Sequence, residues 1–142
     1  IVGLGGDIRF WDGERLNKVD SGTNAALTNL SLSDGRVWVC GREGTVLHGN
    51  LIDGFAQVAD RMDHRLYTSI QAFEGDIWLA SDTGPSGIFK LARYAERPER
   101  VLGPPRDAFI LTQAEGVMWA IGSKSVARLT ADGWRPVKHP DL

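Results

Sequence analysis

The chain has 142 residues, a formal net charge of -2 and an isoelectric point of about 5.9. Hydrophobic residues make up 42% and charged residues 24%, which is ordinary for a soluble globular protein. Acidic and basic residues are interspersed and no segment is rich in Lys and Arg, so we expect no nucleic-acid partner. No apolar run reaches the roughly 20 residues that cross a bilayer, so we expect no membrane partner either.

Cys40 is the only cysteine, so no internal disulfide can form. This favours a reducing compartment, and we expect a cytoplasmic protein. The chain begins at Ile1 and not at Met, which leaves open a targeting segment ahead of it. Cys40 ends an apolar run, Val37–Cys40, and is expected to be a small buried core residue.

A short apolar segment that ends in a small residue recurs four times, beginning at residues 1, 37, 77 and 118. The starts are therefore 36, 40 and 41 residues apart (37 − 1, 77 − 37, 118 − 77). Three copies carry a tryptophan at the second position: Trp38, Trp78 and Trp119. The copies are Ile1–Gly5, Val37–Gly41, Ile77–Ser81 and Met118–Gly122. A period near 40 residues is typical of propeller repeats.

Two further strands are predicted after each apolar segment. The first mixes apolar and polar residues, at Ile8–Trp11, Thr45–His48, Ile88–Leu91 and Val126–Leu129. The second is more polar, at Arg15–Val19, Phe55–Val58, Glu99–Leu102 and Trp134–Lys138. Asp-Gly pairs at residues 12, 53 and 132 predict the hairpin turns between them, since Gly accepts positive φ without steric cost. Pro136 cannot donate to a sheet ladder, so it places the polar strand at the sheet edge.

One more strand precedes the last three apolar segments, at Leu27–Leu32, Leu66–Phe73 and Phe109–Ala114. The predicted order within a repeat is inner strand, Trp strand, mixed strand and polar outer strand. We therefore predict an all-β fold, a β-propeller of four repeats of a four-stranded antiparallel blade. The chain would be one domain, 1–142, with repeats at about 1–26, 27–65, 66–108 and 109–142. A β-sandwich is the main alternative, but it does not explain the return of the Trp-bearing segment.

The first repeat lacks an inner strand, so the prediction contains fifteen strands where four full blades need sixteen. We therefore expect the chain to be part of a larger or completed ring. The missing strand, or further blades, would come from elsewhere in the same propeller.

The stretch Asp34–His48 resembles a unit of bacterial β-propeller proteins, as does Met118–Gly122 followed by Asp132-Gly133-Trp134. The resemblance is loosely to WD40- and YCF48-like repeats, although the Gly-His and Trp-Asp signatures of true WD40 repeats are absent. It covers nearly the whole chain and specifies a fold, not a reaction. Propellers of this kind are found near polymorphic toxin systems, so the resemblance implies an immunity or accessory role.

The candidate binding residues lie in loops expected to converge on one face of the propeller. These loops link an outer strand to the next inner strand, or a Trp strand to a mixed strand, and loops on a rigid scaffold commonly carry binding. The candidates are Thr23, Asn24, Arg42, Glu43, Arg61, Asp63, His64, Arg65, Arg106, Asp107 and Lys124. The expected partner is another protein, such as a toxin, or the remaining blades of the same ring.

The sequence offers no recognisable catalytic set. The three histidines, His48, His64 and His139, have no zinc-site spacing, and the Gly-rich turns lead into no helix. We expect no metal, no cofactor and no enzymatic activity in these residues.

Three alternatives stay open. One is an acid–base pair of Asp63 and His64, and another is a hydrolase whose site residues lie outside this chain. The last is a lectin or small-ligand binder that uses Trp11 or Trp134.

Overall fold

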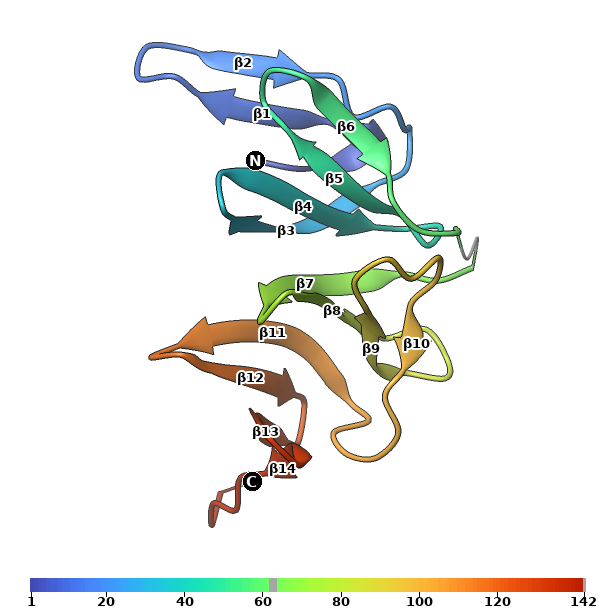
Figure 1. The fold of residues 1–142 in the computed structure, drawn as a ribbon, viewed down its shortest axis with the longest axis vertical. Helices are drawn as coiled ribbons and strands as arrows, with labels where there is room; N and C mark the ends of the chain where they lie inside the picture. The colour runs from blue at the N-terminus through green and yellow to red at the C-terminus, as the bar shows by residue number, and fades with distance from the viewer. Residues whose placement is uncertain (62–63, 142) are drawn as a thin grey trace.

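A computed structural model describes residues 1–61 and 64–141, which form a series of antiparallel sheets (Figure 1). The first sheet pairs β1 (Ile8–Trp11) with β2 (Leu16–Val19). The second contains β3 (Leu27–Ser33), β4 (Arg36–Gly41), β5 (Val46–Asn50) and β6 (Gly54–Gln57). The third contains β7 (Tyr67–Phe73), β8 (Asp76–Ser81), β9 (Gly87–Leu91) and β10 (Glu99–Arg100). The fourth contains β11 (Ala108–Ala114), β12 (Val117–Gly122), β13 (Val126–Thr130) and β14 (Gly133–Pro136).

The strand order within each four-stranded sheet is the predicted one. Hydrogen-bonded neighbours run β3-β4-β5-β6, β7-β8-β9-β10 and β11-β12-β13-β14, each in chain order. The Trp-bearing strand is second in each of the three four-stranded sheets, and Pro136 lies on the edge strand β14 as expected. Among residues 1–61 and 64–141 the only helical element is the short 3-10 turn η1 (Leu4–Gly6), and none there is long and apolar enough to cross a bilayer.

Two-residue turns join the first and second strands of the last three sheets. Their first residues are Asp34, Glu74 and Glu115, with φ of 51°, 50° and 51°, and a positive-φ glycine follows each one. Positive φ at both turn residues is the geometry that suits a tight hairpin between twisted strands. The three acidic side chains therefore stand at equivalent places in successive sheets.

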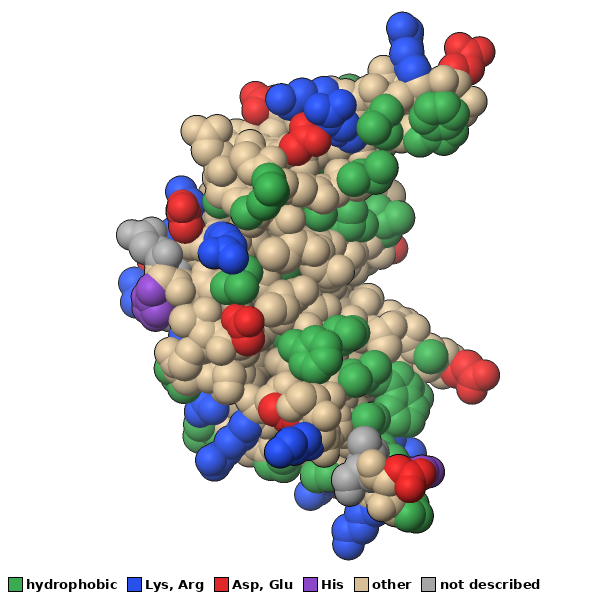
Figure 2. All heavy atoms as spheres, turned by 180° about the vertical axis from the view of Figure 1, so that it is seen from behind, with side chains coloured by type: hydrophobic (Ala, Val, Ile, Leu, Met, Phe, Trp, Pro, Cys, Tyr) green, Lys and Arg blue, Asp and Glu red, His purple; other side chains and the backbone are tan. Residues whose placement is uncertain are grey.

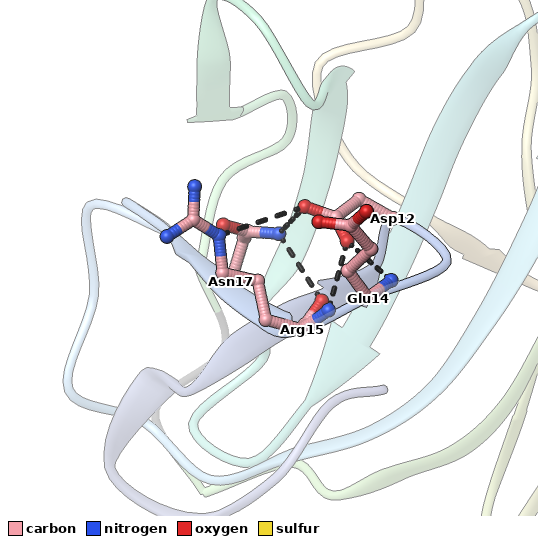
Figure 3. A network of polar contacts seen from close by, with 4 residues as sticks. All are labelled: Asp12, Glu14, Arg15 and Asn17. Atoms are coloured by element: carbon pink, nitrogen blue, oxygen red, sulfur yellow. Dashed lines mark hydrogen bonds and ion pairs between the residues drawn. The ribbon is translucent and has the colours of Figure 1, made fainter.

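Asp12 holds the β1–β2 hairpin together through its carboxylate (Figure 3). Oδ1 accepts hydrogen bonds from the backbone N–H groups of Glu14 and Arg15, both at 2.9 Å, and Oδ2 accepts one from Asn17 Nδ2 at 2.7 Å. The bonds from Arg15, Glu14 and Asn17 lower the pKa of Asp12, because they favour the charged carboxylate. An Asx turn thus accounts for this polar network, which has a structural role.

Successive sheets pack face to face, because the second strand of a sheet is buried on both sides. In β4, Val39 packs toward the first sheet and Cys40 toward the third, and both side chains are fully buried. In β8, Leu79 and Ala80 divide in the same way between the second and fourth sheets. Alternation along a strand sends neighbouring side chains to opposite faces, so one apolar strand can pack against two neighbouring sheets. We call the packed interface between two successive sheets a joint. The Cys40 prediction is confirmed, and burial raises the pKa of its thiol to about 12.

The three tryptophans occupy equivalent register positions, as the repeat predicted. Trp38 pairs with Ser31 and His48, Trp78 with Gln71 and Lys90, and Trp119 with Thr112 and Arg128. Trp38 packs against the core shared with the third sheet, and Trp78 against the core shared with the fourth. Each of these two rings therefore faces the sheet that follows it.

Polar side chains of the inner strands join neighbouring sheets. Asn29 Oδ1 accepts a hydrogen bond from the N–H of Ile70 at 3.0 Å, and Ser69 Oγ accepts one from the N–H of Leu111 at 3.0 Å. Thr28 and Thr68 donate their hydroxyls to the carbonyls of Tyr67 and Phe109 in the following sheet. We call these contacts the cross-sheet hydrogen bonds. They satisfy backbone groups on the free edge of the following inner strand, which has a sheet neighbour on one side only.

The first repeat departs from the prediction. The sequence alignment matched Ile1–Gly5 with Val37–Gly41, but in the structure Gly3 takes the place of Gly41. The N–H of Gly3 donates to the carbonyl of Asp7, as the N–H of Gly41 donates to the carbonyl of Thr45. Val2 likewise bridges Ile8 as Cys40 pairs with Val46. The alignment was therefore wrong by two residues, and residues 4–6 form η1 instead of a strand. Both Gly3 and Gly5 can end an apolar segment, so composition did not separate them.

Replacing Ser69 with alanine should destabilise the fold by about 1–3 kcal/mol, because the buried N–H of Leu111 loses its acceptor. Chemical denaturation would measure the loss. Ser33→Ala is the matched control, since no described residue gives the Ser33 hydroxyl a hydrogen bond. Equal stability of the two variants would contradict a stabilising role for the cross-sheet hydrogen bonds.

Candidate functional site

Four of the predicted binding residues line one small pocket of about 530 Å³, which we call the loop pocket. Thr23 and Asn24 come from the β2–β3 loop, Glu43 from the β4–β5 turn, and Arg61 from the β6–β7 loop. Asp20, Gly22 and Ala25 complete its lining. The expectation that these loops lie together is met here, and whether the pocket binds a partner stays a prediction.

The walls of the loop pocket are fixed by short-range hydrogen bonds. Asp20 Oδ1 accepts from the N–H of Gly22 at 2.9 Å, and Thr23 Oγ1 accepts from the N–H of Ala25 at 3.1 Å. Gly6 lies directly behind this loop, where an added Cβ would stand 1.8 Å from the carbonyl oxygen of Thr23. Only glycine fits that position, which also has a φ of +73°. A rigid loop loses little conformational entropy when a partner binds.

Arg61 and Glu43 form the charged side of the loop pocket. Arg61 Nη2 lies 2.8 Å from Glu43 Oε2, and both side chains are exposed. An exposed ion pair of this kind contributes little to stability. Its charges are available to a partner surface, where they would affect specificity and association rate.

Arg65 does not belong to this surface, which corrects the prediction. Its side chain is only 2% exposed, and Nη1 donates hydrogen bonds to Ser81 Oγ, the carbonyl of Thr83 and the carbonyl of Pro85. Its guanidinium carbon also lies 4.4 Å from the centre of the Phe89 ring, a cation–π distance. Arg65 therefore joins the β6–β7 loop to the β8–β9 loop from inside. A partner protein cannot reach it.

The remaining candidates are not part of the loop pocket. Asp107 accepts hydrogen bonds from the Ser123 hydroxyl, the Lys124 N–H and the Ser125 hydroxyl, so it fixes the β12–β13 turn. These bonds, that of Ser125 foremost, lower the pKa of Asp107 below its ordinary value of 3.8.

Lys124 borders a separate pocket with the C-terminal segment. Arg42, His64 and Arg106 are exposed on their loops. Asp63, and with it the Asp63–His64 acid–base hypothesis, lies outside the described residues.

A larger groove, of about 900 Å³, lies between the second and third sheets, and sequence analysis did not predict it. We call it the turn groove, because the β3–β4 and β7–β8 turns and the β9–β10 loop border it. Figure 1 places those two turns at the left of the molecule. Figure 2, which is seen from behind, shows a hollow bordered by hydrophobic side chains at the corresponding right-hand side. Its aromatic residues are Trp38, His48, Phe73 and Tyr94, the last 90% exposed.

A stacked pair forms one wall of the turn groove. The rings of Trp38 and His48 lie 3.9 Å apart with an angle of 11° between their planes. Arg36 Nε donates a hydrogen bond to His48 Nε2 at 3.0 Å, so this nitrogen acts as an acceptor and carries no proton. Burial, and then the positive charge of Arg36, lower the pKa of His48. A neutral His48 on a flat Trp38 offers a surface for contact but no proton donor at Nε2.

Neither pocket assembles a catalytic arrangement among the described residues. No group of three or more His, Cys, Asp or Glu side chains in residues 1–61 and 64–141 could hold a metal. Trp134, a candidate sugar platform, is 7% exposed and packs edge-to-face on Trp78 at 5.7 Å. Its indole face is therefore not available to a ligand, while Trp11 is 63% exposed.

Comparisons with known proteins bear on both fold and function. The chain is similar to immune protein Tsi7 of Pseudomonas aeruginosa, with 31% identity over 139 residues, 94% of this chain. The match covers 43% of that protein, so the chain spans less than half the length of the curated relative. No protein-family profile matches the sequence.

Two solved structures share the fold. Virginiamycin B lyase from Staphylococcus aureus superposes with a TM-score of 0.65 and 15% identity, over 99% of this chain and 54% of the lyase. The WD40 β-propeller domain of Doa1 superposes with a TM-score of 0.60 and 14% identity, over 94% of this chain and 43% of the Doa1 chain. Identities this low show the fold alone. The β-propeller prediction is confirmed.

Replacing Arg65 with alanine should destabilise the fold by about 2–4 kcal/mol, because the buried Ser81 hydroxyl and the carbonyls of Thr83 and Pro85 lose their donor and a cavity opens beside Phe89. Urea unfolding would measure this loss. Arg61→Ala, which removes only an exposed ion pair, should change stability by less than about 0.5 kcal/mol. The assignment of Arg65 as an internal residue would be wrong if Arg65→Ala were as stable as Arg61→Ala.

Asp107→Asn should lower stability at neutral pH, and the difference from the wild type should shrink in acid. The pKa of Asp107 is lowered in the folded protein, so its stabilising effect is complete above the unfolded-state pKa and is lost as the pH falls through the folded-state value. Denaturation at a series of pH values from about 5 to about 2 would show the convergence. A stability gap that stayed constant over this range would contradict a charge-dependent role.

Proposed function

We propose that this chain is part of an immunity protein, a non-enzymatic β-propeller that binds a toxin protein. The similarity to immune protein Tsi7, 31% identity over 139 residues, is the observation that carries this proposal. The scaffold supports it, because rigid sheets present loops at both ends of their strands and the described residues contain no metal-ligand cluster.

We place the toxin contact at the loop pocket. Its polar wall of Thr23 and Asn24 is held by internal hydrogen bonds, and its charged side, Glu43 with Arg61, is exposed. Polar groups that are fixed before binding can pair with a partner at low entropic cost. The turn groove is the competing surface, since exposed aromatic side chains such as Tyr94 are common in protein interfaces.

The test uses the intact protein that contains this chain and, as candidate toxins, the products of the genes beside its own. Co-expression should restore growth, and the two proteins should co-purify. Arg61→Glu should weaken capture at least about tenfold, about 1.4 kcal/mol, because it sets two carboxylates against each other at the pocket rim. Arg15→Glu, a charge reversal on the distant β1–β2 hairpin, is the control and should bind as the wild type.

A third variant separates the two surfaces. Tyr94→Ala removes a 90% exposed ring from the turn groove and should leave capture unchanged. If Tyr94→Ala weakens capture and Arg61→Glu does not, the partner binds the turn groove and our placement is wrong. If the wild type neither protects cells nor captures the toxin, the immunity role itself fails.

A further inference from the structure

The second and third sheets carry different side chains at two equivalent positions beside their tryptophans. In the third sheet Asp76 begins β8 and Lys90 pairs with Trp78, and Asp76 and Lys90 form an ion pair at 3.0 Å. In the second sheet Arg36 and His48 stand at these positions. Arg36 donates a hydrogen bond to a His48 nitrogen that carries no proton, so the positive charge of Arg36 is not balanced by this partner.

Two guanidinium groups of the turn groove have no anionic partner among the described residues. The bond from Arg36 uses only Nε, which leaves both Nη groups of that side chain without an acceptor in this part of the chain. Arg93 lines the groove from the β9–β10 loop, and its guanidinium carbon lies 5.2 Å from the Tyr94 ring. It likewise forms no ion pair with a described carboxylate. The groove therefore offers two hydrogen-bonding cations, one from each of the sheets that enclose it.

Tyr94 is held in the solvent by a loop that is longer than the corresponding turns of the other sheets. The N–H of Asp60 donates to the carbonyl of Glu96 at 2.8 Å, and the N–H of Arg93 donates to Asp76 Oδ1 at 3.3 Å, so the loop is tied to the β6–β7 loop and to β8. Tyr94 has a φ of 67°, which is unfavourable for a bulky residue, and 90% of its surface is exposed. Backbone strain of this kind is concentrated at binding sites.

The turn groove continues into a smaller pocket of about 470 Å³ between the third and fourth sheets. Both spaces are lined by Phe73 and Glu74 at the β7–β8 turn and by Gly116 at the β11–β12 turn. The combined surface thus reaches from the second sheet to the fourth. An elongated surface with separate side-chain pockets suits an extended peptide, whereas a small molecule usually takes one enclosed cavity.

We infer that the turn groove binds an extended segment of a partner protein in which a carboxylate side chain stands next to an apolar one. The carboxylate accepts hydrogen bonds from Arg36 and Arg93, and the apolar side chain packs on Trp38 and Tyr94. Trp, Tyr and Arg are the residue types that most often dominate the binding energy of protein interfaces. The inference does not depend on the proposed function.

The rim of the groove limits how acidic this segment can be. Asp34 and Glu74 are exposed on the two turns that border the groove, and neither forms an ion pair within the described part of the chain. Like charges brought together at an interface are unfavourable, so a continuous run of carboxylates would be repelled. The segment therefore carries a single carboxylate with apolar or basic neighbours, and the same rim acts against a polyanion such as nucleic acid.

This site is separate from the loop pocket, because the two lie at opposite ends of the strands. β4 begins with Arg36 at the turn groove, and the β4–β5 turn beyond its other end carries Glu43 of the loop pocket. Both walls of the turn groove belong to the described residues of this chain. A partner at the loop pocket and a second partner at the turn groove can therefore be held at the same time.

Peptide selection on the intact protein that contains this chain tests the inference. A phage library of random linear peptides is first depleted on the double variant Arg36→Gln, Tyr94→Ala and then selected on the wild type. The surviving peptides should share an Asp or Glu next to an apolar residue. Changing that acidic residue to its amide should weaken binding at least about tenfold in fluorescence polarisation, because the charge-assisted hydrogen bonds are lost.

Single variants locate the bound peptide. Arg36→Gln should weaken it at least about tenfold. Arg42→Gln is the matched control, since Arg42 is also exposed but follows the other end of β4, and it should bind as the wild type. Arg61→Glu, at the loop pocket, should also leave peptide binding unchanged. Circular dichroism of Arg36→Gln should match that of the wild type, which separates lost contact from lost fold.

Three results would overturn the inference: no peptide surviving the depletion, survivors without a shared carboxylate, or equal binding to Arg36→Gln and the wild type. Peptide binding as expected together with failed toxin capture would refute only the proposed function. Toxin capture without any peptide that depends on Arg36 would refute only this second site.

Discussion

The arrangement of the chain depends on the second strand of each four-stranded sheet, which is apolar on both faces. Val39 and Cys40 in β4, and Leu79 and Ala80 in β8, are all fully buried although neighbours in a strand point to opposite sides. A sheet covered on only one face would expose one of the two rows to water. Stacking the sheets in series removes both rows from water, and each joint then becomes a core shared by two repeats.

The cross-sheet hydrogen bonds add direction to this packing. Apolar contact alone allows sheets to slide, because the hydrophobic effect is non-directional. Asn29 to Ile70 and Ser69 to Leu111 fix one inner strand against the next at a single register. The loops at the strand ends are thereby held in fixed relative positions. The loop pocket lies where the first sheet meets the second, and other bonds hold it there: the N–H of Arg42 donates to the carbonyl of Ala26 at 2.9 Å, and Arg61 Nη2 lies 2.8 Å from Glu43 Oε2.

The sequence predicted the features that local chemistry determines. The recurring tryptophans and the Asp-Gly turns gave the strand order of each repeat, since alternation and positive φ are readable from adjacent residues. The burial of the Arg65 side chain could not be predicted from the sequence, because its charged neighbours indicate a solvated loop. The residues that enclose it belong to the next sheet and are distant in the sequence: Ser81, Thr83, Pro85 and Phe89. The turn groove was missed for the same reason. Trp38 and His48 are paired on adjacent strands of one sheet, but Tyr94 comes from the β9–β10 loop of the next sheet, and only the packing of the two sheets places it in the same groove.

The distribution of polar and apolar joints also bears on where a partner can bind. The loop pocket lies at the first and second sheets, and the hydrogen-bonded joints of the third sheet separate it from the outer face of the fourth sheet, β11–β14. A change at that outer face can reach the loop pocket only by shifting whole sheets against those bonds. The pocket geometry is therefore set mainly by the internal joints, whatever covers Trp119. The interior is rigid, whereas the side-chain types differ at the loops and at the outer face of the last sheet. One repeat can therefore serve both assembly and recognition.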